Sequence, residues 1–495
     1  MVRARARITC RSRPGCAAQP RLDLAIAPVL AEPMPGRFHV HGMREHCVLH
    51  VCSACEHADD SSAKPHEGGS QLDPGQPQPE RHQRERETFG QRESVAARSF
   101  DWLHGVGGSP LFHHRDGNTS PRIAGVIPSI GILCYPTIGG SGRVATDLAA
   151  RLAAQHTRVH LLSWEEPAWL PAGVRFHPVE VVEYPLLRYP PYDQALATQI
   201  AELHERDGVE LFHAHYAIPH AVAVSLADQM LGGGKLRLVT TLHGTDITLV
   251  GSDPAYRRAV HFGLARSDVV TAVSESLRRD TRERIGFEGP IRVIANFVDG
   301  ESFRPGTAPR WPARSAREPR RIVHMSTFRP VKRIRLLIEA VAILARDVPV
   351  RLTLVGDGPE LSAALALAER LGLGSSVVSV GLVEDPAPWL RDADVYMFAS
   401  ETESFGLGVL EAMACGVPVV GPDVGGVSEV LGEPPAGRLV RDASAAALAD
   451  SARALLVDAH AYTRIAERGR GRARSVFAPE RIVASYTTAY VDALG

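Results

Sequence analysis

The stretch that decides the fold is Glu403-Ser-Phe-Gly-Leu-Gly-Val-Leu-Glu-Ala-Met-Ala-Cys-Gly-Val-Pro-Val-Val420. It follows a mostly apolar run, residues 393–400, which predicts a parallel strand buried on both faces. The glycine-containing turn at 404–408 then leads into a short helix, so free backbone N–H groups lie at the carboxyl edge of the sheet. Such a turn can hold a diphosphate. Residues 416–421 predict the next buried strand.

Two glutamates flank this turn and add carboxylates that could bind a sugar. Glu403 precedes the turn and Glu411 lies on the following helix, so both carboxylates can point into one cleft from different elements. Carboxylates accept hydrogen bonds from sugar hydroxyls. An ordinary strand–helix unit with surface glutamates is the alternative. The combination of paired glutamates, a glycine turn and an Ala-Cys-Gly-Val-Pro strand entry favours a nucleotide-sugar site.

Composition sets the broad class of the protein. The chain has 495 residues, of which 44% are hydrophobic and 22% charged, enough for two or three domains with cores of their own. The net charge of −1 argues against a dedicated nucleic-acid-binding protein. No apolar run is long enough to span a bilayer, so we expect no stable membrane insertion. Seven cysteines do not make a disulfide scaffold in a chain of this length, and we expect a cytoplasmic, reducing location.

Residues 1–125 differ from the rest of the chain. They are rich in Arg, Pro, His, Gln and Gly without sustained apolar periodicity, which predicts a poorly ordered extension. A translated upstream region is the alternative, with the functional start near Val126. A zinc site would draw on His46, Cys47, His50, Cys52, Cys55 and His57. Because a single C-x-x-C has no second spaced pair here, we favour flexible-tail composition over a metal site.

The first predicted domain, residues 126–304, opens with a strand at 126–135, a glycine-rich loop at 136–142 and a helix through about Ala154. The loop is not G-x-G-x-x-G, and the next strand, 159–164, ends without a lone ribose-binding acid. A nicotinamide cofactor is therefore poorly supported. The loop suits a phosphate or carboxylate at the helix N-terminus, with a plain tight turn as the alternative.

Two later strands of this domain, 209–216 and 236–242, end in polar residues at the same ligand-binding edge. A metal interpretation would use His213, His215 and His220. No acidic or cysteine partner stands near them in sequence, so we interpret them as core or loop histidines. His243 differs because a glycine follows it at a strand end, where its ring can approach a reacting sugar. We favour a functional role for it.

A proline- and arginine-rich segment, 305–320, predicts a linker to a second domain at 321–478. The first strand of that domain leads to Arg329 and Lys332, two cations suited to a diphosphate, although a solvated helix start is the alternative. The D-x-D triplet of Asp392 and Asp394 enters a buried strand rather than leaving it, so we interpret it as a turn and expect no metal. The last helix, 479–495, is a candidate to cross back to the first domain.

These motifs together resemble the E-x7-E signature of retaining family 4 glycosyltransferases, and the resemblance covers residues 126–495. It implies the GT-B architecture, an α/β fold with two Rossmann-like, doubly wound domains facing across a cleft. Further stretches resemble the family members that transfer GlcNAc from UDP-GlcNAc to the hydroxyl of L-malate, the step that opens bacillithiol biosynthesis. These stretches are Ile130–Gly142, His213–Ala221, Thr240–Thr248 and Asn296–Asp299.

The resemblance also implies roles for individual residues. The donor site would comprise Gly140, Gly142, Arg329, Lys332, Glu403, Ser404, Phe405, Gly406, Leu407, Gly408 and Glu411. Within it, Glu411 would hold the ribose hydroxyls and Glu403 the hexose, while the cations and the glycine turn would hold the diphosphate. The acceptor would be bound by Ser141, Tyr216, Thr241 and Thr327. The family usually has Asn at position 327, so the contact made there is altered in this chain.

His243 and Glu403 would be the catalytic residues at the reacting sugar. No carboxylate stands out as a nucleophile, which favours a front-face route in which an oxygen of the leaving diphosphate takes the acceptor's proton. A mechanism with a covalent intermediate stays open as the alternative. We expect neither a cofactor nor a metal, and a homo-oligomer is compatible with the sequence.

Three other functions stay open from the sequence. A family 4 transferase with an inositol phosphate or lipid acceptor belongs to the same class. A GT-B-shaped UDP-GlcNAc 2-epimerase would bind the same donor without an acceptor. A regulator would bind the nucleotide sugar without turnover.

Overall fold

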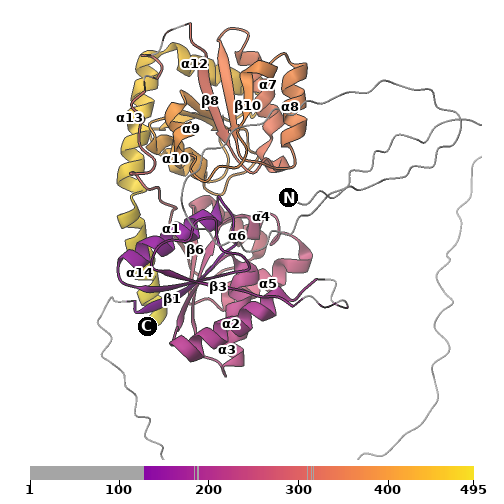
Figure 1. The fold of residues 1–495 in the computed structure, drawn as a ribbon, viewed down its shortest axis with the longest axis vertical. Coiled ribbons are helices and arrows are strands. Elements are labelled where there is room, and N and C mark those ends of the chain that lie inside the picture. Colours follow the sequence, from indigo (N-terminus) through magenta and orange to yellow (C-terminus); the bar gives the residue numbers. More distant parts are fainter. Residues whose placement is uncertain are drawn as a thin grey trace, which may run out of the picture. The chain divides into compact units, whose positions relative to one another are not determined.

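The computed structural model describes residues 127–182, 184, 186, 189–308, 310–313, 315 and 317–495. The predicted extension at 1–125 and its candidate zinc ligands lie outside the described residues. The expectation of two Rossmann-like domains is confirmed, and each domain contains one parallel sheet (Figure 1).

The first sheet is parallel throughout, and among the described residues it has seven strands in the order β3-β2-β1-β4-β5-β6-β7. The strands are β1 (Ser129–Leu133), β2 (Arg158–Ser163), β3 (Val174–Pro178), β4 (Leu211–His215), β5 (Arg237–Leu242), β6 (Val269–Ala272) and β7 (Ile291–Val293). Every residue of β1, β4 and β6 is buried. Such continuous burial is expected for a sheet covered by helices on both faces.

Helices connect most of these strands, as is usual for parallel pairing, whereas residues 164–173 join β2 to β3 without a helix. The helices are α1 (Ser141–Ala154), α2 (Tyr192–Asp207), the short turn η1 (Ala217–Ala221), α3 (Val222–Met230), α4 (Thr245–Thr248), α5 (Pro254–Ala265) and α6 (Glu275–Ile285). The predicted end of the first helix near Ala154 is confirmed. Ser274 caps α6, because its hydroxyl accepts a hydrogen bond from the backbone N–H of Leu277.

The second sheet is also parallel and repeats this order, with β10-β9-β8-β11-β12-β13 among the described residues. Its strands are β8 (Arg320–Met325), β9 (Val350–Val355), β10 (Val377–Ser379), β11 (Val395–Met397), β12 (Val419–Pro422) and β13 (Gly437–Val440). Its helices are η2 (Pro330–Lys332), α7 (Ile334–Leu344), α8 (Leu361–Arg370), η3 (Gly374–Ser376), α9 (Ala387–Asp392), α10 (Leu407–Ala414), α11 (Val427–Leu431), α12 (Ala445–Val457) and α13 (Ala459–Val476).

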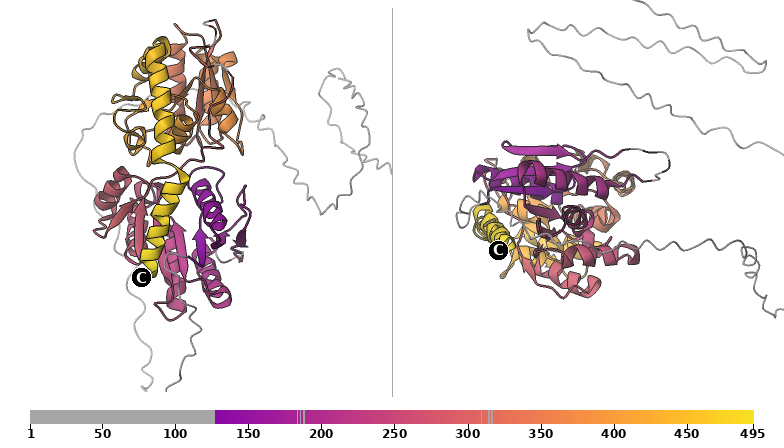
Figure 2. Two further views of the ribbon diagram at one scale, coloured as in Figure 1. Left: turned by 90° about the vertical axis from the view of Figure 1, so that its left-hand side faces the viewer. Right: turned by 90° about the horizontal axis from the view of Figure 1, so that it is seen from below.

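The last helix, α14 (Pro479–Leu494), packs on the first domain although it follows the second in sequence (Figure 2). Its buried residues Tyr486 and Tyr490 join the cluster that contains Ile130 and Ile132 of β1. The predicted crossing of the last helix is therefore confirmed.

Two strands were not predicted, and several predicted strands are shorter than expected. β3 and β13 are edge strands whose residues are partly exposed, so they lack a continuous apolar run. Strands were predicted at 126–135 and 393–400, and β1 and β11 keep five and three residues of those runs. The residues of these two runs that follow β1 and β11 lie in loops at the carboxyl edge, whereas Asp394 precedes β11 at its amino end.

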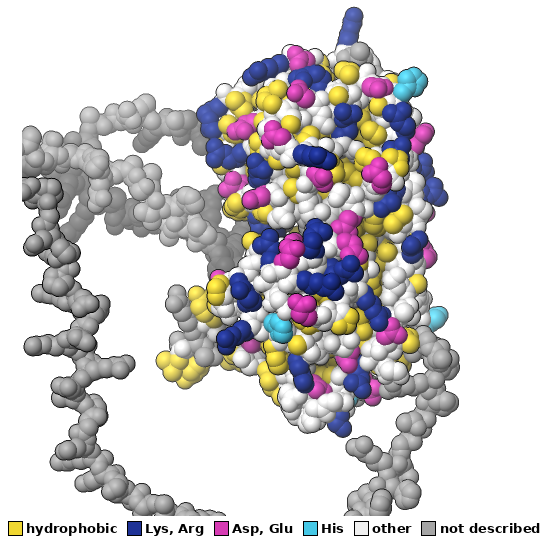
Figure 3. Space-filling view, turned by 180° about the vertical axis from the view of Figure 1, so that it is seen from behind, with side chains coloured by type: hydrophobic (Ala, Val, Ile, Leu, Met, Phe, Trp, Pro, Cys, Tyr) yellow, Lys and Arg dark blue, Asp and Glu magenta, His cyan; other side chains and the backbone are white. Residues whose placement is uncertain are grey.

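Basic and acidic side chains are interspersed over the face shown in Figure 3, with apolar side chains between them. Within the part of the chain that the structure describes, no helix is both long and apolar enough to cross a membrane.

Candidate active site

The candidate residues gather where strand order reverses in each sheet. In the first sheet this point lies between β1 and β4, and in the second between β8 and β11. Loops at the carboxyl ends of such strands form a crevice, which is where ligands bind in open α/β sheets. Ser141 and Tyr216 follow the first pair of strands, whereas Lys332 and Glu403 follow the second pair.

The glycine-rich loop after β1 is closed tightly on itself. A Cβ at Gly142 would collide with the backbone oxygens of Tyr135 and Thr137, so this position needs glycine. The backbone N–H of Gly142 donates to Oγ1 of Thr137 over 3.2 Å. Gly140 is exposed and has a φ of 62°, which turns the chain into α1. The loop therefore presents the first turn of a long helix to the crevice.

Two of the four acceptor candidates are brought together. Oγ of Ser141 and the hydroxyl of Tyr216 lie 2.8 Å apart, although 75 positions separate them in sequence. Both side chains are partly buried, and burial raises the pKa of the Tyr216 hydroxyl above its usual value. Tyr216 has a φ of 99°, unusual for a residue with a side chain. A neutral pair of hydroxyl donors results.

His243 lies beside this pair. Its ring centroid is 5.3 Å from that of Tyr216, and its Nε2 is 2.9 Å from Nδ1 of His215. Burial, with a smaller contribution from His220, lowers the pKa of His243 to about 3. The imidazole is therefore neutral at physiological pH and able to exchange hydrogen bonds.

Thr241, predicted as an acceptor ligand, is not placed with these residues. Its side chain is fully buried, and Oγ1 lies 2.7 Å from both Nε2 of His213 and Oγ1 of Thr271. His213 in turn lies 2.8 Å from the hydroxyl of Tyr490 on α14. The hydroxyl at position 241 thus holds the interior of the first sheet to the last helix. The interpretation of His213, His215 and His220 as core histidines is confirmed, since all three are fully buried.

In the second domain, Lys332 and Glu403 form an ion pair. Nζ of Lys332 lies 2.7 Å from Oε1 of Glu403, and the hydroxyl of Ser400 donates to the same oxygen over 2.7 Å. Both side chains of the ion pair are partly buried. Lys332 and Ser400 therefore hold the Glu403 side chain in one direction.

Arg329 and Thr327 lie on an exposed loop after β8. Nε of Arg329 donates to Oγ1 of Thr327 over 3.2 Å. Gly358 packs closely against this loop, because a Cβ at that position would collide with the backbone oxygen of Thr327. Arg329 thus makes this side-chain hydrogen bond within its own loop, and the residue is exposed.

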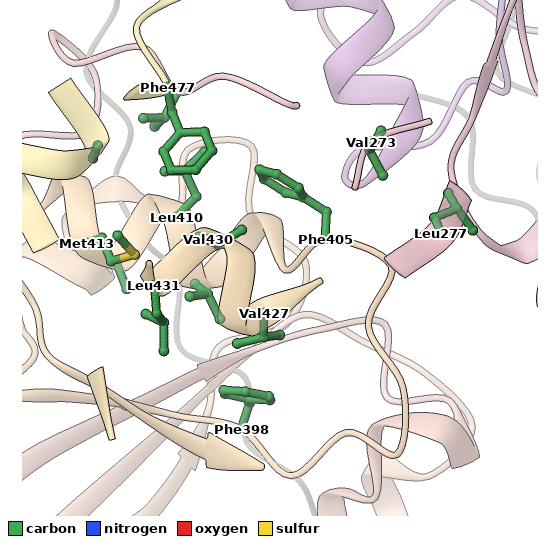
Figure 4. Packing of buried hydrophobic residues seen from close by; sticks show 14 of the residues in the cluster. Val273, Leu277, Phe398, Phe405, Leu410, Met413, Val427, Val430, Leu431 and Phe477 are labelled. Atoms are coloured by element: carbon green, nitrogen blue, oxygen red, sulfur yellow. The ribbon is translucent and has the colours of Figure 1, made fainter. Parts of the chain in front are cut away.

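The turn at 404–408 is anchored by Phe405, which is buried and not open to a ligand. Its ring packs edge-to-face on Phe477 with centroids 5.8 Å apart, and Figure 4 shows it between Phe477 and Val273. Gly406 has a φ of 95°, and a Cβ at Gly408 would strike the hydroxyl of Tyr396. Phe405 thus fixes the turn, leaving Ser404, Leu407 and Gly408 partly exposed.

Glu411 lies on the first turns of α10, close to two residues that sequence analysis missed. A small cavity is lined by Glu411 together with Arg143 and Asp147 of α1. Nε of Arg143 donates to both carboxylate oxygens of Asp147 at 2.9 Å. Burial raises the pKa of Glu411 to about 8; Arg143 opposes this shift and Asp147 adds to it. Arg143 and Asp147 lie on the helix that directly follows the glycine-rich loop, and this position is the sequence signal that could have identified them.

The D-x-D triplet lies at the opposite edge of the second sheet, as predicted. Asp392 ends α9 and Asp394 precedes β11, at its amino end. Asp394 is fully buried, and its two oxygens accept backbone N–H groups of Trp311 at 2.9 Å and Arg321 at 2.8 Å. Its carboxylate therefore joins the linker to the sheet.

The site has a further buried carboxylate, Asp246, to which sequence analysis gave no role. It is 2% exposed and accepts backbone N–H groups from the segments that carry Tyr216 and His243.

Comparisons with known proteins show the family of the chain. A family model described as Glycosyltransferase Family 4 matches residues 138–302, and one described as Glycosyl transferases group 1 matches residues 319–458. The chain is 40% identical over 370 residues to N-acetyl-alpha-D-glucosaminyl L-malate synthase of Bacillus anthracis, covering 74% of this chain and 97% of that protein.

Two more distant similarities add context. The chain is 36% identical over 201 residues to D-inositol 3-phosphate glycosyltransferase of Frankia alni, covering 37% of this chain and 48% of that protein. Among solved structures, sucrose-phosphate synthase from Thermosynechococcus elongatus is similar with a TM-score of 0.62 at 23% identity, over 73% of this chain and 98% of that one. The last similarity concerns the fold alone.

Proposed function

Because the chain belongs to glycosyltransferase family 4 and has the GT-B fold, we propose that it transfers GlcNAc from UDP-GlcNAc to the hydroxyl of L-malate with retention at the anomeric carbon. By the same proposal this reaction opens bacillithiol biosynthesis in the cytoplasm. The observation that carries it is the 40% identity to the L-malate synthase, which extends over 97% of that protein.

The donor would bind to the second domain. Glu411, with a pKa raised to about 8, offers a largely protonated carboxyl that can both donate to and accept from ribose hydroxyls. Lys332 and Arg329 follow β8 and offset diphosphate charge, supported by the N-terminus of α10 at Leu407. Glu403, oriented by Ser400, would accept hydrogen bonds from the hexose hydroxyls.

The acceptor would bind to the first domain. Malate is a small dianion, so it needs hydrogen-bond donors and cations around its carboxylates. The paired hydroxyls of Ser141 and Tyr216 and the first N–H groups of α1 offer donors. Arg329, from the second domain, is the proposed cation, and Thr327 beside it would orient the guanidinium through its hydroxyl.

The chemistry would proceed on one face of the sugar. The bond between the anomeric carbon and the diphosphate oxygen breaks, the malate hydroxyl oxygen bonds to the same face, and its proton passes to the leaving diphosphate. His243 is neutral, because its pKa is about 3, and would act by hydrogen bonding to the sugar rather than as a cation. Lys332 and Arg329 would stabilise the charge that develops on the leaving group, so no metal is proposed.

A second candidate is transfer to an inositol phosphate, favoured by the 36% identity to the D-inositol 3-phosphate glycosyltransferase. That similarity extends over 48% of the relative, so it supports the acceptor assignment less than the L-malate synthase does.

The test is release of UDP from UDP-GlcNAc with and without L-malate, with product mass measured in parallel. We expect UDP release that depends on malate and a product equal to malate plus one GlcNAc. Release without malate would indicate hydrolysis, and loss of UDP-GlcNAc to its 2-epimer would indicate an epimerase. Either result would refute the proposal.

A further inference from the structure

Asp246 lies at the start of α4 and contacts the backbone of the segments that carry Tyr216 and His243. Its side chain is 2% exposed. Oδ1 accepts the backbone N–H of Gly244 at 2.9 Å and that of His243 at 3.3 Å, while Oδ2 accepts the backbone N–H of Ala217 at 3.3 Å. One carboxylate therefore holds two loops, with one oxygen for each.

These two loops carry the groups that would meet the acceptor and the sugar in the proposed complex. The first follows β4 and contains Tyr216, and the second follows β5 and contains His243. Both turn through the left-handed region of φ, at 99° for Tyr216 and 115° for Gly244. Such conformations persist when surrounding contacts hold them, so the hydrogen bonds to Asp246 are well placed to do so.

We propose that Asp246 is a positioning residue for glycosyl transfer, which ties the Tyr216 loop to the His243 loop and so fixes the acceptor hydroxyl group against the sugar. The inference rests on the proposed function, because it assumes that the groups of Tyr216 and His243 meet the acceptor and the sugar. Their ring centroids are 5.3 Å apart, and small changes in such spacing are costly in rate.

A carboxylate is the group that this position needs. All three of its partners are N–H donors, and only an ionised carboxylate offers acceptors on both oxygens. In Asp246→Asn one oxygen becomes an NH₂ group that faces a donor, so at least one loop loses its anchor. The substitution changes neither the volume of the side chain nor any group exposed to the crevice.

The chain supplies a matched control in Asp228 of α3. It also accepts three backbone N–H groups, from Gly234 at 3.0 Å, Lys235 at 2.8 Å and Leu236 at 3.0 Å. Those residues precede β5, at the amino edge of the sheet, whereas Asp246 follows β5 at the carboxyl edge. Asp228→Asn therefore removes the same kind of contact without touching the acceptor loops.

The experiment compares wild type, Asp246→Asn and Asp228→Asn in full-length protein, by steady-state kinetics with UDP-GlcNAc and L-malate and by thermal melting. For Asp246→Asn we expect kcat to fall at least about tenfold and KM for malate to rise, while UDP affinity stays within about twofold of wild type. For Asp228→Asn we expect both constants within about twofold. Equal losses in the two variants, or wild-type kinetics in Asp246→Asn, would overturn the proposal.

A second readout does not depend on the acceptor. Backbone hydrogen exchange should be faster in segments 215–218 and 243–248 of Asp246→Asn than in wild type, and unchanged there in Asp228→Asn. Unchanged exchange in both segments would overturn the positioning role even if malate is the acceptor. Faster exchange in these segments would support the positioning role even if malate is not the acceptor. Should Asp246→Asn not fold, Asp246→Glu keeps both acceptor oxygens one methylene further out and is expected to show the same loss of kcat.

Discussion

Nζ of Lys332 lies 2.7 Å from Oε1 of Glu403, so the residue proposed for the diphosphate and the residue proposed for the hexose form an ion pair with each other. The ion pair, together with the hydrogen bond from Ser400, fixes the direction of the Glu403 carboxylate. Both residues follow strands at the same switch point of the second sheet, so in the proposed complex the lysine would lie where the leaving diphosphate and the sugar join.

Loss of either partner should damage transfer more than stability. We expect Glu403→Gln and Lys332→Met each to lower kcat/KM at least about tenfold, because an oriented charge is lost at the reacting centre. Both side chains keep some exposure, so the melting temperature should fall by no more than about 2–4 °C. Arg453→Met, which breaks a remote 2.8 Å ion pair with Asp347, is the control for charge loss in the same domain. Wild-type kinetics in both active-site variants would remove these residues from the mechanism.

Tyr216→Phe should raise KM for malate by about fivefold with little change in KM for UDP-GlcNAc, since it removes one hydroxyl from the pair with Ser141. Tyr462→Phe provides the comparison, because that hydroxyl donates over 2.8 Å to the backbone oxygen of Asp394, at the other edge of the second sheet. If both variants altered malate KM alike, the hydroxyl at 216 would have no acceptor role.

Glu411 predicts a specific pH dependence of stability. Its pKa is raised by burial from 4.5 to about 8, so the folded protein holds this proton more tightly than the unfolded chain. The resulting stabilisation is complete below pH 4.5 and is lost as pH rises toward 8. Glu411→Gln stays neutral and lacks this loss. The melting temperature of the variant should therefore rise relative to that of wild type as pH increases across that window. A difference that stays constant over the window would contradict the raised pKa.

Removal of divalent metals should leave transfer intact. Arg329, Lys332 and the N-terminus of α10 offset the diphosphate charge in the proposed complex, and Asp394 is occupied by backbone N–H groups. Activity after EDTA treatment is therefore expected to match untreated enzyme. Abolition by EDTA with recovery on adding Mg²⁺ or Mn²⁺ would require a metal-binding role for other carboxylates.

Much of the fold was predictable because both sheets are parallel and buried, so their central strands appear as continuous apolar runs. The edge strands β3 and β13 were missed for the converse reason. Each has one neighbour and partly exposed residues, and Pro178 ends β3. Local sequence cannot separate such segments from loops.

The limits of prediction within the site have a similar cause. Glycine turns and strand exits located Ser141, Lys332 and Glu403 correctly at the switch points, because they depend on local geometry. Sequence could not show that the hydroxyl of Thr241 turns inward to His213, nor that Arg143 lies near Glu411. Both facts depend on packing between elements far apart in the chain.

The central claim is the identity of the acceptor, and a competition assay tests it most directly. UDP-GlcNAc is supplied with equal concentrations of L-malate, D-malate, succinate, glycerol phosphate and inositol 3-phosphate, and the products are separated by mass and by the chirality of the malate. Succinate lacks the reacting hydroxyl, and D-malate cannot present its hydroxyl and both carboxylates to the same donors at once. We predict that GlcNAc-L-malate is the dominant product, with the α configuration of the donor retained. Preferential transfer to inositol 3-phosphate would contradict the assignment of malate while leaving the donor site and the fold intact.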